Sequence, residues 1–235
     1  MKLKVAAISD LHGYFPEMTE PADILLIVGD ISPLEIQFNK PKMKIWIETE
    51  FAYWVKSLPV ERVFLVAGNH DAYFESISQG NILSMLQACG KLTYLRNEVG
   101  YYYDTNAQLW TIFGTPYCHI FGNWPFMRTE EYMVEKFQSI PDKVDIIMSH
   151  DPPYSMGDVD VILDAPQHRS QRMFQHLGNI PLMERVEKVD YKLLVCGHIH
   201  GGDHELNKEY KTVNVSYLNE YYTPQYPIFY TEIEQ

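Results

Sequence analysis

Residues 63–71 read Val-Phe-Leu-Val-Ala-Gly-Asn-His-Asp, an apolar run that ends in three polar side chains. The run is short and rich in β-branched and aromatic residues, and no polar residue alternates with them. This pattern is typical of a strand that is buried on both faces. Four other apolar runs end in the same way: residues 4–9 before Asp10 and His12, 24–29 before Asp30, 146–149 before His150, and 193–197 before His198 and His200.

These five polar endings predict where a site lies. In open α/β sheets, ligands bind in the crevice beyond the carboxyl ends of the strands. Because each polar group follows its strand directly, we expect all of them to converge on one rim. The sequence therefore predicts an α/β fold whose functional site is assembled from nearly the whole chain.

Length and charge narrow the class of protein. The chain has 235 residues, enough for a sizeable core, and we expect one α/β domain over residues 1–235. Its formal net charge is −12, which leaves no broad basic field for a nucleic-acid backbone. We therefore expect no duplex nucleic acid as a partner, and a small anion is the better candidate.

Cysteine usage and hydropathy predict a location. Cys89, Cys118 and Cys196 are far apart and form no Cys-x-x-Cys pair, which favours a reducing compartment. The apolar start of the chain is too short for a signal peptide and runs into Asp10, so we interpret it as a strand. No run approaches membrane-spanning length. We expect a cytoplasmic protein without membrane contact, of undetermined oligomeric state.

The remaining elements follow from periodicity and turn residues. Asp104-Thr105-Asn106 is a turn signal inside an alternating segment, which predicts a hairpin over 99–113. The polar stretch 151–180, broken by Pro and Gly, is long enough to be a functional loop. Helices are expected over 43–58, 77–88, 130–138 and 181–189, and closing strands over 213–217 and 228–233.

The polar endings have the composition of a metal centre. Asp10 and His12 are two residues apart, so both side chains face one side of an extended chain. His198 and His200 have the same spacing. Carboxylate oxygens mixed with imidazoles suit Mn, Fe or Zn. The full set exceeds what one tetrahedral ion uses: Asp10, His12, Asp30, Asn69, His150, His198 and His200.

We therefore predict two divalent or mixed-valence metal ions, with Asp30 as a bridge at a separation of roughly 3.5–4 Å. Such a site attracts anions and supplies a metal-bridging hydroxide as the nucleophile near neutral pH. His70 is then the group that donates a proton to the leaving oxygen or stabilises the transition state. Asp71 is the expected carboxylate that orients the His70 ring.

In joint order these motifs resemble those of the calcineurin-like metallophosphoesterase superfamily. They are Asp10-Leu11-His12, Gly29-Asp30, Gly68-Asn69-His70-Asp71, His150 and Gly197-His198-Ile199-His200. The resemblance implies a four-layer α/β/β/α sandwich with a dinuclear centre. It also implies one metal on Asp10, His12, Asp30 and His200, and a second on Asp30, Asn69, His150 and His198.

A looser resemblance points to the metallophosphodiesterase-domain (Mpped-type) branch, near the class III cyclic-nucleotide phosphodiesterases. It rests on His150-Asp151-Pro152-Pro153, Gly157-Asp158, Gly201, Asn214-Val215-Ser216 and the prolines of 222–228. It implies a metal-dependent phosphodiesterase acting on small or nucleotide-like phosphoesters. A phosphomonoesterase or protein phosphatase is the alternative, and a non-catalytic scaffold of the same fold is a remote one.

Substrate-binding residues are expected in the loops after residues 116 and 150. Aromatic rings there could stack on a base, and arginines could clamp a phosphate. The preferred candidates are His119, Tyr154 and Arg169. Trp124 and Arg128 are weaker candidates, and the tyrosines near Tyr221 are expected to serve packing.

Overall fold

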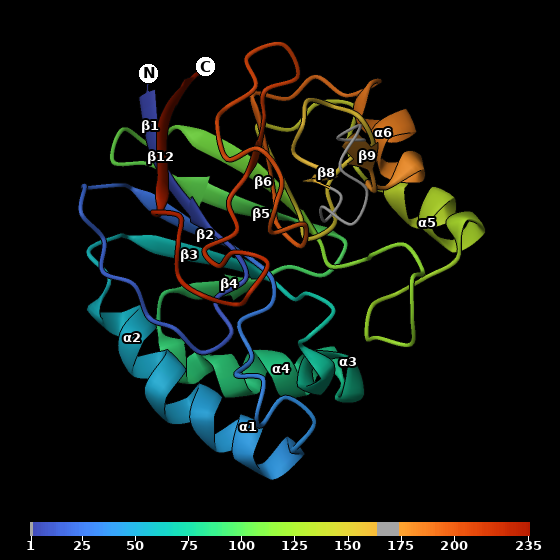
Figure 1. The fold of residues 1–235 in the computed structure, drawn as a ribbon. Helices are drawn as coiled ribbons and strands as arrows, with labels where there is room; N and C mark the ends of the chain where they lie inside the picture. Colours follow the sequence, from blue (N-terminus) through green and yellow to red (C-terminus); the bar gives the residue numbers. More distant parts are fainter. Residues whose placement is uncertain (1, 164–173) are drawn as a thin grey trace.

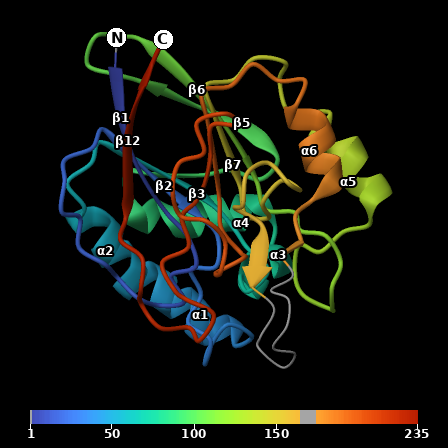
Figure 2. The same ribbon diagram turned by 45° about the horizontal axis from the view of Figure 1, so that its top comes forward.

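Two β-sheets lie face to face with helices on their outer sides (Figures 1 and 2). The computed structural model describes residues 2–163 and 174–235. The first sheet has the order β12 (Phe229–Glu234), β1 (Lys2–Ile8), β2 (Ile24–Val28), β3 (Arg62–Val66), β4 (Leu92–Tyr94). The second has the order β11 (Thr212–Asn214), β10 (Leu193–Cys196), β7 (Ile146–Ser149), β6 (Leu109–Thr115), β5 (Glu98–Tyr103). Within each sheet four strands are parallel. The antiparallel edge strand is β12 in the first sheet and β5 in the second.

The helices form the two outer layers. Those below the first sheet in Figure 1 are α1 (Lys40–Trp46), α2 (Ala52–Ser57), α3 (Ala72–Ser76) and α4 (Gln79–Leu86). A π-helical segment (Ile47–Phe51) joins α1 to α2, and a 3₁₀ turn (Gln87–Cys89) follows α4. The second sheet is covered by α5 (Glu130–Phe137) and α6 (Ile180–Val186). The predicted four-layer α/β/β/α arrangement is confirmed.

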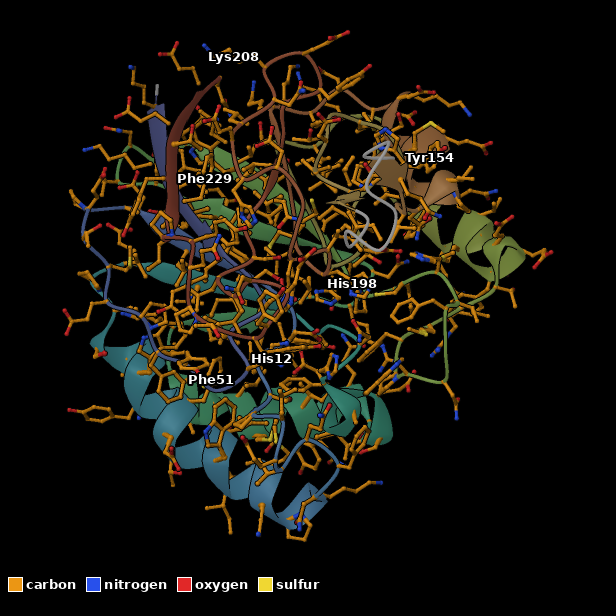
Figure 3. The ribbon with its side chains drawn as sticks, viewed as in Figure 1. His12, Phe51, Tyr154, His198, Lys208 and Phe229 are labelled. Atoms are coloured by element: carbon orange, nitrogen blue, oxygen red, sulfur yellow. The ribbon has the colours of Figure 1, made fainter. Side chains whose placement is uncertain are left out.

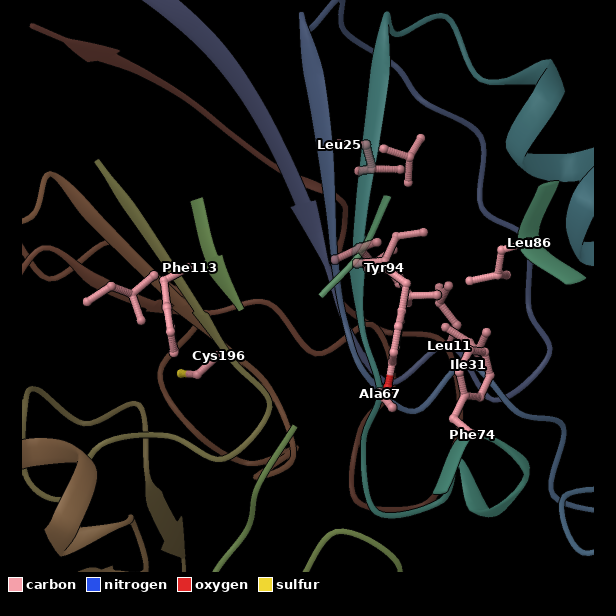
Figure 4. Packing of buried hydrophobic residues seen from close by; sticks show 14 of the residues in the cluster. Leu11, Leu25, Ile31, Ala67, Phe74, Leu86, Tyr94, Phe113 and Cys196 are labelled. Carbon is pink, nitrogen blue, oxygen red and sulfur yellow. The ribbon is translucent and has the colours of Figure 1, made fainter. Parts of the chain in front are cut away.

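Strand periodicity divides the core between the layers. In β2, Leu26 and Val28 pack toward the second sheet, whereas Leu25 and Ile27 pack with the helices. Figure 4 shows Leu25 on the first sheet, with Phe113 and Cys196 apart from it on the second. The central strands β2, β7 and β10 are buried along their whole length, which explains their unbroken apolar runs.

Most predicted elements are confirmed within a few residues. The helix expected over 43–58 begins three residues earlier, since Asn39 caps its first turn by accepting from the backbone N–H of Lys42. The hairpin over 99–113 is β5 and β6. The loop expected over 151–180 also contains a small antiparallel pair, β8 (Val161–Leu163) and β9 (Phe174–His176), which the sequence pattern did not predict.

The two sheets meet at their carboxyl ends, where β1 leads into the second sheet. The Ser9 backbone N–H donates to the Val215 carbonyl at 2.8 Å, and the Tyr217 N–H donates to the Ser9 carbonyl at 2.9 Å. This junction brings residues far apart in sequence to a common rim. In the part of the chain that the structure describes, no helix is long and apolar enough to cross a membrane.

Candidate metal centre

Unusual backbone geometry turns the polar side chains inward at the strand ends. Asp10, His12, Asp30 and His198 have positive φ angles of 55°, 41°, 52° and 68°. Such angles are uncommon for residues with a Cβ and cost conformational energy. Their concentration on four of the seven expected ligands indicates that the fold is held in this shape for the site.

Glycine is required where the backbone passes directly against the ligands. A Cβ on Gly68 would lie 2.3 Å from Asp30 Oδ1 and 2.5 Å from His150 Nε2. A Cβ on Gly197 would lie 2.5 Å from Asp10 Oδ2. No real Cβ approaches another atom so closely, so these positions are reserved for glycine.

The first group of candidate ligands consists of Asp10, His12 and His200, each of which has one potential ligand atom within 4.8 Å of those of the other two. The Ser216 hydroxyl (2.7 Å) and the His198 backbone N–H (3.0 Å) both donate to Asp10 Oδ2. The other oxygen, Oδ1, faces His200 Nε2 at 3.3 Å. His200 Nδ1 donates to the Asn219 carbonyl at 2.9 Å, which leaves Nε2 as the atom aimed at the group.

The second group is centred on His150. Its Nδ1 donates to the Val28 carbonyl at 2.8 Å, so Nε2 is directed at Asp30 Oδ2 (3.3 Å) and Asn69 Oδ1 (3.1 Å). Asp30 Oδ2 also lies 3.8 Å from His12 Nε2. Asp30 Oδ2 thus lies between His12 of the first group and His150 of the second.

These residues fit a bound cation. Asp10 Oδ1 and both ring nitrogens of His12 are buried and accept or donate no hydrogen bond, a costly state that metal coordination would relieve. Burial alone would raise the pKa of Asp10, but His200, His150 and His12 hold that pKa well below its usual range. Burial opposes the charge on His150, yet Asp30 raises its pKa to about 10. The carboxylates of Asp10 and Asp30 therefore favour positive charge at this place, as a bound cation would supply.

The structure corrects the expected partner of His70. Asp71 accepts from the Ser32 backbone N–H (3.0 Å) and hydroxyl (2.6 Å) through Oδ1, and from the Gly68 N–H (2.8 Å) through Oδ2. It braces the loops after β2 and β3 and does not orient the ring. Instead, Gln37 Oε1 accepts from His70 Nδ1 at 2.9 Å. Sequence reasoning missed Gln37 because a single amide in a loop carries no motif.

A cavity of about 490 Å³ opens above the ligands. Trp124 and Tyr222 form part of its wall, with Trp124 4.5 Å from the His70 ring and Tyr222 5.1 Å from the His12 ring, centroid to centroid. The expectation that the tyrosines near Tyr221 only pack is therefore wrong for Tyr222. The residues that line the cavity are Asp30, Asn69, His70, His119, Phe121, Trp124, Leu177, His198, Ile199, His200 and Tyr222.

The residues expected to bind substrate lie in different places. His119 lines the cavity, and its ring nitrogen Nδ1 lies 2.9 Å from Asp151 Oδ2. Tyr154 packs against His176 and is not among the lining residues, and Figure 3 shows it apart from His198 and His12. Arg128 pairs with Glu75 at 2.6 Å. Arg169 lies outside the described residues.

The structure brings one further side chain to the ligands. The Cys118 thiol lies within 4.8 Å of ligand atoms of His150 and His198. Burial and the neighbouring carboxylates raise the pKa of Cys118 well above its ordinary value. This contact could not be predicted from sequence, because Cys118 is about 30 residues from His150 and belongs to no motif.

The facing sheets and the clustered carboxylate and imidazole ligands define the class of metallophosphoesterases. Comparison of the sequence with known families finds a match to the calcineurin-like phosphoesterases over residues 3–202. The chain belongs to this family, and its clustered carboxylate and imidazole side chains could hold metal ions.

Similar proteins agree with this assignment. Human metallophosphoesterase domain-containing protein 1 is 27% identical over 85% of this chain and 61% of its own length. An uncharacterized metallophosphoesterase of Bacillus subtilis, YkoQ, is 24% identical over 92% of this chain and 68% of its own. The chain thus spans about three fifths of the human protein that it matches.

A solved structure supports the fold. The phosphopantetheinyl hydrolase of Mycobacterium tuberculosis superposes with a TM-score of 0.52 at 13% identity, over 91% of this chain and 88% of that one. At this identity the likeness shows a common fold and carries no argument about substrate.

Metal removal is expected to destabilise the protein. Dialysis against a chelator leaves Asp10 and His12 buried without partners, whereas added Mn²⁺ or Zn²⁺ binds the folded state alone. At a hundredfold excess over Kd, each site should contribute about 2.7 kcal/mol to the free energy of unfolding. Thermal unfolding midpoints measured during a metal titration check this. In Asp10→Asn the rise in midpoint should shrink, and an unchanged midpoint in the wild type would contradict the assignment.

Proposed function

We propose that this chain is a dinuclear-metal phosphodiesterase that acts on small or nucleotide-like phosphoesters. The observation that carries the proposal is the Asp30 carboxylate standing between His12 and His150, each from a different ligand group. Asp10, His12, Asp30 and His200 would hold one ion, and Asp30, Asn69, His150 and His198 the other. Manganese, iron or zinc suits these oxygen and nitrogen ligands.

The reaction needs activation of water and of the phosphoryl group. Bound divalent ions supply both, since they lower the pKa of water and neutralise charge on phosphoryl oxygens. The chain's own residues hold the remaining groups. Gln37 accepts from His70 Nδ1 and thereby fixes the ring. In the imidazolium form of His70, Nε2–H is then the group that delivers a proton to the leaving oxygen, and the ring is left neutral. Asp71 and Ser32 keep the loop that carries Asn69 and His70 in place.

The lining of the cavity supports a diester. Among the described residues that line it, none is Lys or Arg. A terminal phosphate with two charges is commonly clamped by such cations, whereas a diester carries one charge. Trp124, Phe121 and Tyr222 offer apolar rings to a planar leaving group. The three buried, unpaired cysteines support the proposal of a reducing, cytoplasmic compartment.

A matched pair of aryl esters tests the proposal. Metal-free protein should be reloaded with Mn²⁺, Fe²⁺, Zn²⁺ or Mg²⁺ and assayed on bis(p-nitrophenyl) phosphate and on p-nitrophenyl phosphate. We expect metal-dependent hydrolysis with a higher kcat/KM for the diester. A preference for the monoester would favour a phosphomonoesterase, and no hydrolysis with any metal would favour a scaffold.

His70 is expected to matter most when the leaving group is poor. His70→Ala should lower kcat by about 10²- to 10⁴-fold on an alkyl diester, the range of general acid catalysis. The loss should be smaller on a p-nitrophenyl diester, because that leaving group departs without a proton. Gln37→Ala, which frees the ring but keeps it, should lie between wild type and His70→Ala. Equal losses on both esters would contradict this role.

A further inference from the structure

The cavity contains a second histidine that is oriented by a carboxylate. Asp151 is fully buried, and its Oδ2 accepts from the His119 backbone N–H and from His119 Nδ1, both at 2.9 Å. Asn179 Nδ2 donates to the same oxygen at 3.0 Å. Three donors therefore fix this oxygen, and it fixes the His119 ring in turn. His70, by contrast, has only the neutral Gln37 amide at its Nδ1.

The two histidines occupy different sides of the cavity. The His70 ring lies 4.9 Å from that of His12, in the first ligand group. The His119 ring lies 6.4 Å from that of His198, an expected ligand of the second. Both line the cavity, and because Nδ1 of each is engaged, Nε2 is the nitrogen left for a bound molecule.

We propose that His119 is a substrate-binding residue whose imidazolium Nε2–H donates a hydrogen bond to a phosphoryl oxygen, and that Asp151 is its positioning residue. This inference rests on the proposed function, because it assigns a substrate contact within the same site. It also accounts for a cavity without Lys or Arg among its described lining residues, since His119 supplies a hydrogen-bonding group on the His198 side.

The chain offers a matched control. His176 Nδ1 lies 2.7 Å from Oδ1 of the fully buried Asp160, so it forms the same kind of pair. Its side chain is 29% exposed, against 28% for His119. His176 does not line the cavity. Substitution of His176 therefore measures what losing a carboxylate-bound histidine does to the fold alone.

Kinetics on the zinc-loaded protein test the proposal. With bis(p-nitrophenyl) phosphate, His119→Ala should raise KM by about ten- to a hundredfold, the effect of losing one hydrogen bond to a charged group. His119→Gln keeps an amide N–H near the position of Nε2 and should recover part of the loss. His176→Gln should leave KM unchanged. A wild-type KM in His119→Ala would overturn the proposal.

A titration without turnover separates this inference from the proposed function. Inorganic phosphate added to zinc-loaded protein should shift the His119 ring signals in a long-range ¹H–¹⁵N spectrum and leave those of His176 unmoved. In Asp151→Asn the signal of the Asp151-bonded Nδ1 proton should change even before phosphate is added. If phosphate leaves the His119 signals in place, the inference fails, whether or not the wild type hydrolyses esters.

Discussion

Replacing Asp30 by Asn is expected to lower metal-dependent phosphoester hydrolysis by about a thousandfold or more, the scale of losing a charged group at the reacting centre. The Asn side chain has the same size, and its oxygen can still accept the 2.7 Å bond from the His70 backbone N–H. Its amide nitrogen then replaces Oδ2 between His12 and His150. A neutral donor there cannot hold a cation, so both ligand groups lose their common member.

The measurement is kcat/KM on an aryl diester together with the metal content of each protein. Asp145→Asn is the matched control, because Asp145 is also buried and accepts from the Thr111 N–H and hydroxyl at 2.8 and 2.9 Å, away from the cavity. It should lose stability and keep its metal. Asp30→Asn with wild-type turnover would refute the assigned role of Asp30.

Gly68→Ala is expected to damage the site through the backbone. The new methyl group meets Asp30 Oδ1 and His150 Nε2 at once, so both side chains must move or the loop after β3 must shift. Overpacking of this kind costs about 1–3 kcal/mol of folding free energy. Displaced ligands should also weaken metal affinity by about 10- to 100-fold, as disturbance of supporting contacts does in metal sites.

Gly80→Ala is the control, because it is the same substitution at a position with room for a methyl group. Gly80 lies in α4, and a Cβ there meets no atom within 4 Å. Alanine should therefore raise the free energy of unfolding by about 0.5–1 kcal/mol through helix propensity and leave metal binding unchanged. Chemical denaturation of both variants, with and without metal, makes the comparison. If Gly68→Ala retained wild-type affinity for metal, the packing described around Asp30 and His150 would be wrong.

The sequence predicted the strands and their polar endings because both signals are local. A short apolar run indicates a buried strand without reference to the rest of the chain, and residues that directly follow parallel strands lie on the same rim of a sheet. The seven expected ligands accordingly come together in the structure. Their roles as ligands stay a prediction until metal is measured.

The side-chain partners could not be predicted in the same way. Gln37 lies 33 residues before His70, and Tyr222 lies far from His12, so tertiary structure alone brings each pair together. Asp71 was the expected partner of His70 because it is adjacent in sequence. Its carboxylate accepts instead from the Ser32 and Gly68 backbone N–H groups, which are buried and need an acceptor. The three-residue strands β8 and β9 were too short to give a periodic signal.

The most direct test is the number of metal ions bound per chain. Protein freed of metal, reloaded with Mn²⁺ or Zn²⁺ and dialysed should be measured by elemental analysis and assayed on bis(p-nitrophenyl) phosphate. We predict two ions per chain in the wild type, with hydrolysis that appears as they bind. Fewer than one ion per chain under saturating metal, together with no hydrolysis, would contradict the dinuclear centre assigned to these strand ends.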